Sequence, residues 1–275
     1  MSNAVFTTSH FLGDGTQLTF INNLNSAMLT AGFTLLDSYT NTGLYRVWNC
    51  DTGGGFTFSN LILEFGFSST NVNYTLKGYS NWDTSTKTGS NASSTFTSNS
   101  SPISSLSSSF NLYTVSHPEI RGVFIYETTT PRLFVGYLRP DPSLPGNAWF
   151  SQNAAPLAFI LSPANGSLDF SRSSQQGALQ SISSLRPHVN LGNVGLTPVG
   201  VTTGNYVTGN MRAMFPANIV TTAGELVLFF SSDLVLGGAS GLTLLDYSMV
   251  GATKYSFFSA TAAGENVAKL FIKTA

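Results

Sequence analysis

Short runs of β-branched and aromatic residues, separated by turn-forming clusters, constrain the fold of this chain more than any other feature. FTLLDSY (33–39) is followed by TNTG and then by LYRVWNC (44–50), the pattern of two strands joined by a short turn. Similar runs recur along the chain at 56–67, 72–80, 110–115, 122–128, 132–138, 205–215, 224–232, 241–250, 254–260 and 266–273. Short connections favour antiparallel pairing. The sequence therefore predicts a mainly β protein with antiparallel, sandwich-like sheets and long Ser-rich loops.

One short N-terminal helix is expected at 17–31, QLTFINNLNSAMLTA. Its apolar residues recur at the spacing of one helical face, as Phe20, Leu24, Met28 and Ala31. Gly32 follows directly, and glycine is the usual residue just past a helix C-terminus. We expect the helix to end there.

A proline-rich segment divides the chain. RPDPSLPG (139–146) holds three prolines in eight positions, and proline cannot donate a hydrogen bond to a sheet. We therefore predict two domains, an N-terminal helix plus antiparallel β domain at 1–146 and a second β-rich domain at 147–275. Residues 168–198 have no clear period and are predicted to form a long loop or arm.

Charge is scarce in this sequence. Lys, Arg, Asp and Glu make up 9% of the residues, whereas a soluble domain carries roughly 25%. The chain holds 37 Ser, 31 Thr and 22 Asn, so hydroxyls and amides must form much of its surface. The net charge of −1 gives no electrostatic footprint for nucleic acid, and near-zero charge favours association between molecules.

The sequence argues against membrane insertion and general export. No run of 18 apolar residues is present, so no transmembrane helix is predicted. The opening MSNAVFTTSHFLGDGTQ has no basic and no apolar signal region, which favours an assembly made inside a cell. Cys50 is the single cysteine, which excludes an intrachain disulfide and a cysteine-based zinc site.

Catalytic motifs are missing from the sequence. His10, His117 and His188 lie far apart and form no metal-ligand spacing, and no G-x-S-x-G elbow occurs. Gly53 to Gly55 lie between strand-like runs, where a turn or bulge is expected. We therefore predict no enzyme, no metal and no cofactor. A hydrolase stays open as a third alternative, and it would need a pocket with a perturbed acid or base.

Two aromatic residues are candidates for binding. Trp82 lies near Tyr79 in the polar stretch KGYSNWDTSTKTG. An exposed aromatic ring there would stack on a sugar or anchor a partner chain. The alternative is that Trp82 covers the end of a hairpin, and the sequence leaves both interpretations open.

Ser and Thr fill most of residues 89–110, and none of these residues is charged. Four large apolar residues lie within the stretch: Phe96, Ile103, Leu106 and Phe110. Ser101 and Pro102 could begin a short helical turn. Ordering backbone costs roughly 1–2 kcal/mol per residue, so we predict that these apolar residues contact neighbouring subunits, which offset that cost.

Three segments carry a resemblance to virion structural proteins of tailed bacteriophages: INNLNSAMLTAGFTLLDSYTNTGLYRVWNC, GYSNWDTSTKTGSNASS and GNMRAMFPANIVTTAGELVLF. The resemblance is one of style, being β-rich, charge-poor and rich in Ser, Thr and Asn. It implies a tail, baseplate, neck or head-surface component that assembles in the host cytoplasm as a symmetric homo-oligomer with other virion proteins. It implies no catalytic residues.

The alternative function is an adhesin at the tail tip or particle surface. It would bind a receptor or a host-surface glycan, with Tyr79 and Trp82 as its stacking platform. Neither function involves nucleic acid or a membrane.

Overall fold

The structure is a computed structural model of the chain. It describes residues 3–50, 61–67, 72–79, 81–90, 92, 96–97, 103–138, 144, 159–161, 179–181, 193–198, 207–208, 211–212, 214–221, 226–229, 231–237, 246–257 and 269–275. The predicted boundary at residue 146 and most of the predicted arm at 168–198 lie outside these residues.

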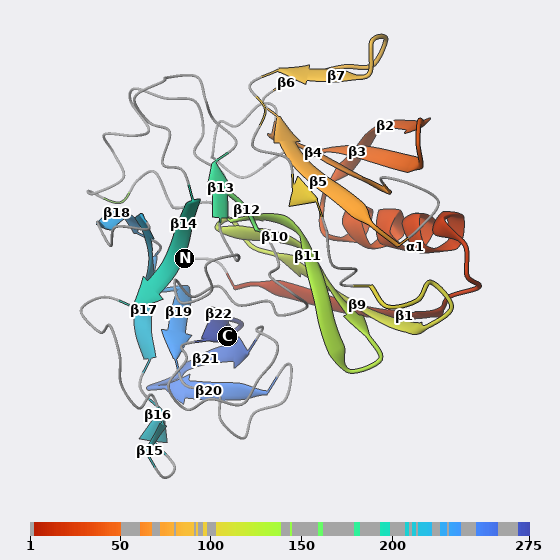
Figure 1. Ribbon diagram of the computed structural model, residues 1–275. Helices are drawn as coiled ribbons and strands as arrows, with labels where there is room; N and C mark the ends of the chain where they lie inside the picture. The colour runs from red at the N-terminus through yellow and green to blue at the C-terminus, as the bar shows by residue number, and fades with distance from the viewer. Residues whose placement is uncertain are drawn as a thin grey trace.

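One helix and eleven strands form the N-terminal half of the described structure (Figure 1). They are β1 (Val5–Leu12), α1 (Gln17–Thr30), β2 (Thr34–Thr40), β3 (Leu44–Cys50), β4 (Leu61–Phe67), β5 (Tyr74–Tyr79), β6 (Asn81–Asp83), β7 (Thr88–Ser90), β8 (Phe96–Thr97), β9 (Ser109–Ser116), β10 (Ile120–Glu127) and β11 (Thr130–Leu138). The predicted mainly β fold with antiparallel sheets and one N-terminal helix is confirmed.

The C-terminal half contributes strands alone to the described structure. They are β12 (Phe159–Leu161), β13 (Leu179–Ser181), β14 (Asn193–Pro198), β15 (Val207–Thr208), β16 (Met211–Arg212), β17 (Met214–Thr221), β18 (Leu226–Phe229), β19 (Leu234–Gly237), β20 (Tyr247–Val250), β21 (Thr253–Phe257) and β22 (Lys269–Lys273). The single strand expected at 205–215 is instead the β15–β16 hairpin followed by the start of β17. β14 lies where an arm was predicted.

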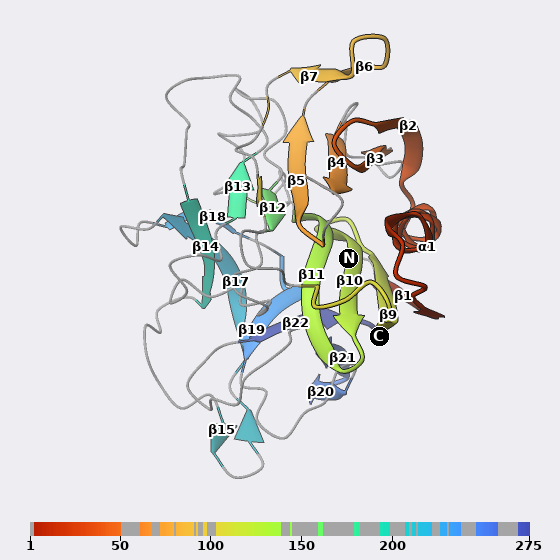
Figure 2. The same cartoon turned by 45° about the vertical axis from the view of Figure 1, so that its right-hand side comes forward.

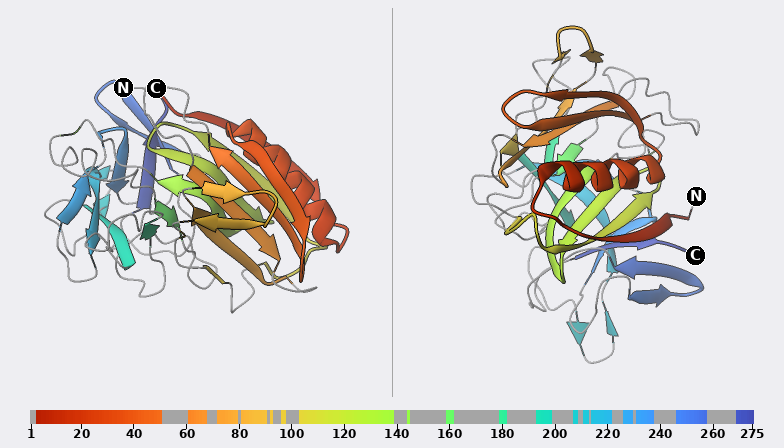
Figure 3. Two further views of the ribbon diagram at one scale, coloured as in Figure 1. Left: turned by 90° about the horizontal axis from the view of Figure 1, so that it is seen from above. Right: turned by 90° about the vertical axis from the view of Figure 1, so that its right-hand side faces the viewer.

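Two sheets share the main core. One is the five-stranded sheet β2-β3-β4-β5-β8, and the other is the β1-β9-β10-β11 part of a 13-stranded sheet. Their inward side chains, such as Phe65 and Leu112, belong to one buried cluster with Phe20 and Leu24 of α1. Figure 3 shows α1 running beside the strands, between the β2–β3 hairpin and β1.

Local chemistry sets both ends of α1. Thr16 is its N-cap, and the Thr16 hydroxyl accepts a hydrogen bond from the Thr19 amide (3.2 Å). At the other end Gly32 adopts φ +92°, and the Gly32 and Phe33 amides donate to the Leu29 and Met28 carbonyls, both at 3.0 Å. This is the Schellman arrangement, and it confirms the predicted stop at Gly32.

The two halves of the described chain are continuous in hydrogen bonding. The 13-stranded sheet runs from β1 through β11 and β12 to β20, and the strands of the C-terminal half lie beside those of the N-terminal half in Figure 2. Near the chain ends, the Ala4 amide donates to the Lys273 carbonyl (3.0 Å).

Candidate functional site

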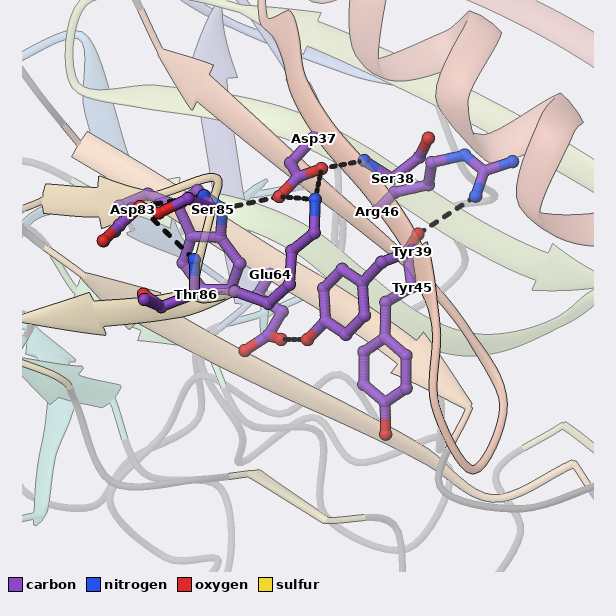
Figure 4. Close-up of polar contacts among 11 residues, drawn as sticks. Asp37, Ser38, Tyr39, Tyr45, Arg46, Glu64, Asp83, Ser85 and Thr86 are labelled. Carbon is purple, nitrogen blue, oxygen red and sulfur yellow. Dashed lines mark hydrogen bonds and ion pairs between the residues drawn. The ribbon is translucent and has the colours of Figure 1, made fainter.

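The outer face of the five-stranded sheet carries a cluster of aromatic and acidic side chains. Successive strand residues point to opposite faces. Trp48, Leu63 and Phe65 therefore enter the main core, while their neighbours Val47 and Glu64 point outward. The sheet and the β6–β7 hairpin together supply the cluster: Asp37, Tyr39, Tyr45, Glu64, Tyr79, Trp82 and Lys87. We call it the outer-face cluster, and Figure 4 shows most of its members.

Glu64 lies buried beneath two tyrosines. Tyr39 Oη and Tyr79 Oη donate to its two carboxylate oxygens, the latter at 2.5 Å. Burial, reinforced by the hydrogen bond to Glu64, raises the pKa of each phenol well above the ordinary value for tyrosine. Both tyrosines therefore keep the protons that they donate. The two phenol hydroxyls thus hold the buried Glu64 side chain in place.

Asp37 fastens the β6–β7 hairpin to the edge of the sheet. Trp82 Nε1 donates to Asp37 Oδ2 (2.9 Å), and Lys87 Nζ lies 2.8 and 3.0 Å from the two oxygens. The Ser38 amide donates as well, at 2.8 Å. Burial alone would raise the pKa of Asp37, but the bonds from Lys87 and Trp82 outweigh it and the pKa is lowered.

Aromatic rings fill the space between these polar groups. Tyr39 and Tyr45 stack with centroids 4.8 Å apart, and Tyr79 meets Trp82 edge-on at 5.3 Å. A Cβ on Gly89 would lie 2.1 Å from the Tyr79 ring. The hairpin can lie against Tyr79 only because this position has no side chain.

The predicted stacking platform is not open. Tyr79 and Trp82 are 6% and 8% exposed, because each packs against the other and bonds a carboxylate. The alternative, in which Trp82 covers a hairpin, describes its position. Tyr39 and Tyr45 are half-buried instead. The signal that could have found them is their placement three residues on either side of Thr42 in the predicted turn, which makes them direct cross-strand partners.

The predicted subunit-contact residues lie in a different place from the outer-face cluster. Ile103, Leu106 and Phe110 are buried in the main core of their own chain, and Phe96 lies in β8, paired with Leu76. In this fold the first three side chains are not available to a neighbouring subunit. Residues 103–110 form a turn leading into β9, where a short helical turn was expected.

A buried carboxylate from another strand orders the described part of the serine stretch. Glu127, at the end of β10, accepts hydrogen bonds from the Ser104 amide (3.0 Å), the Ser104 hydroxyl, the Ser105 amide (3.1 Å) and the Ser108 hydroxyl (2.5 Å). Arg132 Nε lies 2.7 Å from the same carboxylate. These bonds offset the entropic cost of ordering this loop within the chain, and no sequence pattern indicates them.

Exposed apolar side chains gather at the sheet edges. The large exposed hydrophobic residues of the described chain belong to three edge strands and to α1. They are Val5 and Leu12 on β1, Leu18 and Leu29 on α1, Leu35 and Leu36 on β2, and Tyr247, Met249 and Val250 on β20. β1, α1 and β20 carry no Lys, Arg, Asp or Glu. Exposed apolar side chains of this kind are suited to association, although Lys254 of β21 lies over the Tyr247 ring of β20.

Metal and membrane sites are not found in the described part of the chain. No group of three or more His, Cys, Asp or Glu side chains is placed there to hold a metal ion. Within the same residues, no helix has the length and apolar character needed to cross a membrane.

Comparison with known proteins does not assign the chain to a family. No protein-family model matches the sequence, and a search of curated proteins finds no match.

Proposed function

We propose that this chain is an assembly subunit of a tailed-bacteriophage virion, built in the host cytoplasm into a symmetric homo-oligomer that also contacts other virion proteins. The observation that carries the proposal is the concentration of exposed apolar side chains on β1, β20 and α1, whose own residues include no Lys, Arg, Asp or Glu. Edge strands are templates for pairing with another chain, and soluble monomers usually protect them with charge or proline.

The net charge of −1 supports the same proposal. Subunits that carry almost no charge repel one another little when they are packed at high density. The contacts between them would be apolar and backbone-mediated, so salt would screen them little.

Two measurements test the proposal. Sedimentation of the purified chain should give a discrete oligomer that persists in 1 M salt. Immunogold electron microscopy of particles from the producing lysate should place label at a fixed position on each particle. A monomer at every concentration, with label absent from intact particles, would refute it.

A glycan-binding adhesin is the second candidate, favoured by the stacked, half-buried pair Tyr39 and Tyr45. Aromatic faces beside hydroxyl and charged groups are the usual components of a sugar site. Glycan binding that Tyr45→Ala abolishes and Tyr113→Ala leaves intact would support it. Tyr113 is the matched control because it is also half-buried, on β9.

A further inference from the structure

β1 forms an unprotected edge of the large sheet. It pairs with β9 along all eight residues and is the terminal strand in the described sheet order. VFTTSHFL contains no Lys, Arg, Asp, Glu or Pro, the residues that usually blunt such an edge. Val5 and Leu12 are 66% and 70% exposed.

The backbone hydrogen bonds show which residues of β1 face outward. The Gly13 amide donates to the Ser108 carbonyl (2.9 Å), and the Thr7 carbonyl accepts from the Thr114 hydroxyl (3.2 Å). Odd-numbered backbone groups therefore face β9. Since the direction alternates along an antiparallel strand, even-numbered groups face away from it.

One end of this outer edge is already occupied. Ala4 is even-numbered, and its amide donates to the Lys273 carbonyl of β22. The outward backbone groups of Thr8 and His10 lie beyond that contact, with Ser9 between them. Ser9 is exposed, and its own backbone groups face β9.

We propose that two copies of this chain pair their β1 strands antiparallel about a two-fold axis at Ser9. This pairing rests on the proposed assembly function and specifies one contact between two subunits. Thr8 and His10 then exchange hydrogen bonds with His10 and Thr8 of the second copy. Leu12 lies opposite Phe6 of the second copy on the same face. Ser9 meets Ser9 as a non-hydrogen-bonded pair, the closer kind.

The second copy is the occupant because the edge is self-complementary. A two-fold contact presents the same surface on both sides, so each charge on it would meet a like charge nearby. β1 has no Lys, Arg, Asp or Glu to repel its copy. An antiparallel copy also satisfies the outward N–H and C=O groups of Thr8 and His10 on both strands at once, because a two-fold axis makes the two strands antiparallel.

Cysteine cross-linking tests this pairing in the full chain carrying Cys50→Ser. Opposed Cα atoms about 4.5 Å apart in a non-hydrogen-bonded pair lie within disulfide range. Ser9→Cys should therefore give a disulfide-linked dimer under mild oxidation. Thr84→Cys, exposed in the turn of the β6–β7 hairpin, should not.

A charge variant supplies the second measurement. Ser9→Lys places two ammonium groups face to face and should weaken self-association about two- to fivefold, whereas Thr84→Lys should leave it unchanged. Circular dichroism checks that each variant is folded. If Ser9→Lys unfolds, the cross-linking result of Ser9→Cys decides the question alone, because replacing serine by cysteine changes the side chain very little.

The outcomes separate the pairing from the assembly function. A wild-type oligomer that persists in Ser9→Lys and does not cross-link through Ser9→Cys overturns the β1 pairing and leaves the assembly proposal standing. A wild-type chain that stays monomeric at every concentration overturns both.

Discussion

At the scale of single residues, the buried carboxylate of Glu127 stabilises the serine loop through its bonds to Ser104 and Ser108. Burial alone would raise its pKa, but the bonds from Ser104 and Ser108 and the nearby Arg132 outweigh burial and lower it. A carboxylate whose pKa is lower in the folded state stabilises the fold above its unfolded pKa of about 4.3. That contribution is lost as pH falls through the folded pKa.

Glu127→Gln should destabilise the chain by about 2–4 kcal/mol, because one amide cannot accept the same set of donors. Denaturant unfolding at neutral pH measures the loss, which should shrink as the pH is lowered below about 4. Asp83→Asn is the control, since Asp83 bonds only within its exposed turn, to Ser85 and Thr86, and should barely change stability. Equal stability of Glu127→Gln and the wild type would contradict the prediction.

Gly32 is the second position where one residue decides local structure. Gly32→Ala should cost about 1–2 kcal/mol, because an L-residue is strained at φ +92°. Gly32→Asn should cost less, since asparagine tolerates the left-handed region. Thermal unfolding ranks the three chains, and an alanine variant as stable as the wild type would show that the Schellman turn adjusts freely.

At the scale of elements, the β6–β7 hairpin depends on one carboxylate of the neighbouring sheet. Asp37→Asn removes the ion pair with Lys87 and weakens the bond from Trp82. Losing about 1.4 kcal/mol or more of charge-assisted bonding should raise hydrogen exchange across 81–90 at least tenfold.

Acid should loosen the same hairpin. The pKa of Asp37 is lowered in the fold, so docking is complete above its unfolded pKa of about 3.9 and is lost as pH falls through the folded value. Asp14→Asn serves as the control, because Asp14 is an exposed carboxylate outside the hairpin that bonds Thr16 and Thr19. Unchanged exchange in Asp37→Asn would mean that ring packing alone holds the hairpin.

At the scale of the whole molecule, a buried polar contact joins the two halves. Glu119 Oε1 and Oε2 accept from the Ser231 amide (2.7 Å) and hydroxyl (2.5 Å). His117 Nε2 lies 3.5 Å from Asp233 beside them. Glu119 therefore links residues of the two halves of the described chain, and the strength of that link can be measured.

Glu119→Ala should uncouple the halves, so that calorimetry resolves two unfolding transitions where the wild type gives one. The loss should be about 3 kcal/mol, typical of leaving buried polar groups without their charged partner. Glu119→Gln keeps one acceptor oxygen and should give an intermediate result. A single unaltered transition in Glu119→Ala would show that the shared sheet couples the halves without this contact.

The sequence by itself determined the features whose causes lie close together along the chain. Helix α1 and its stop at Gly32 follow from a 3.6-residue period and a glycine, and the β2–β3 hairpin follows from two short runs around TNTG. Such patterns need no knowledge of distant residues. The predicted runs account in this way for β2 to β5, β9 to β11, β18 and β20 to β22.

Only the tertiary structure decided the features that depend on distant partners. β1 pairs with β9 about a hundred residues away, Trp82 is buried by Asp37, and the serine loop is held by Glu127. The periodicity of a sequence indicates which face of an element is apolar. It does not indicate which distant carboxylate will accept a hydrogen bond from a given hydroxyl. For this reason the fold buries five of the predicted binding and contact residues within the chain: Tyr79, Trp82, Ile103, Leu106 and Phe110.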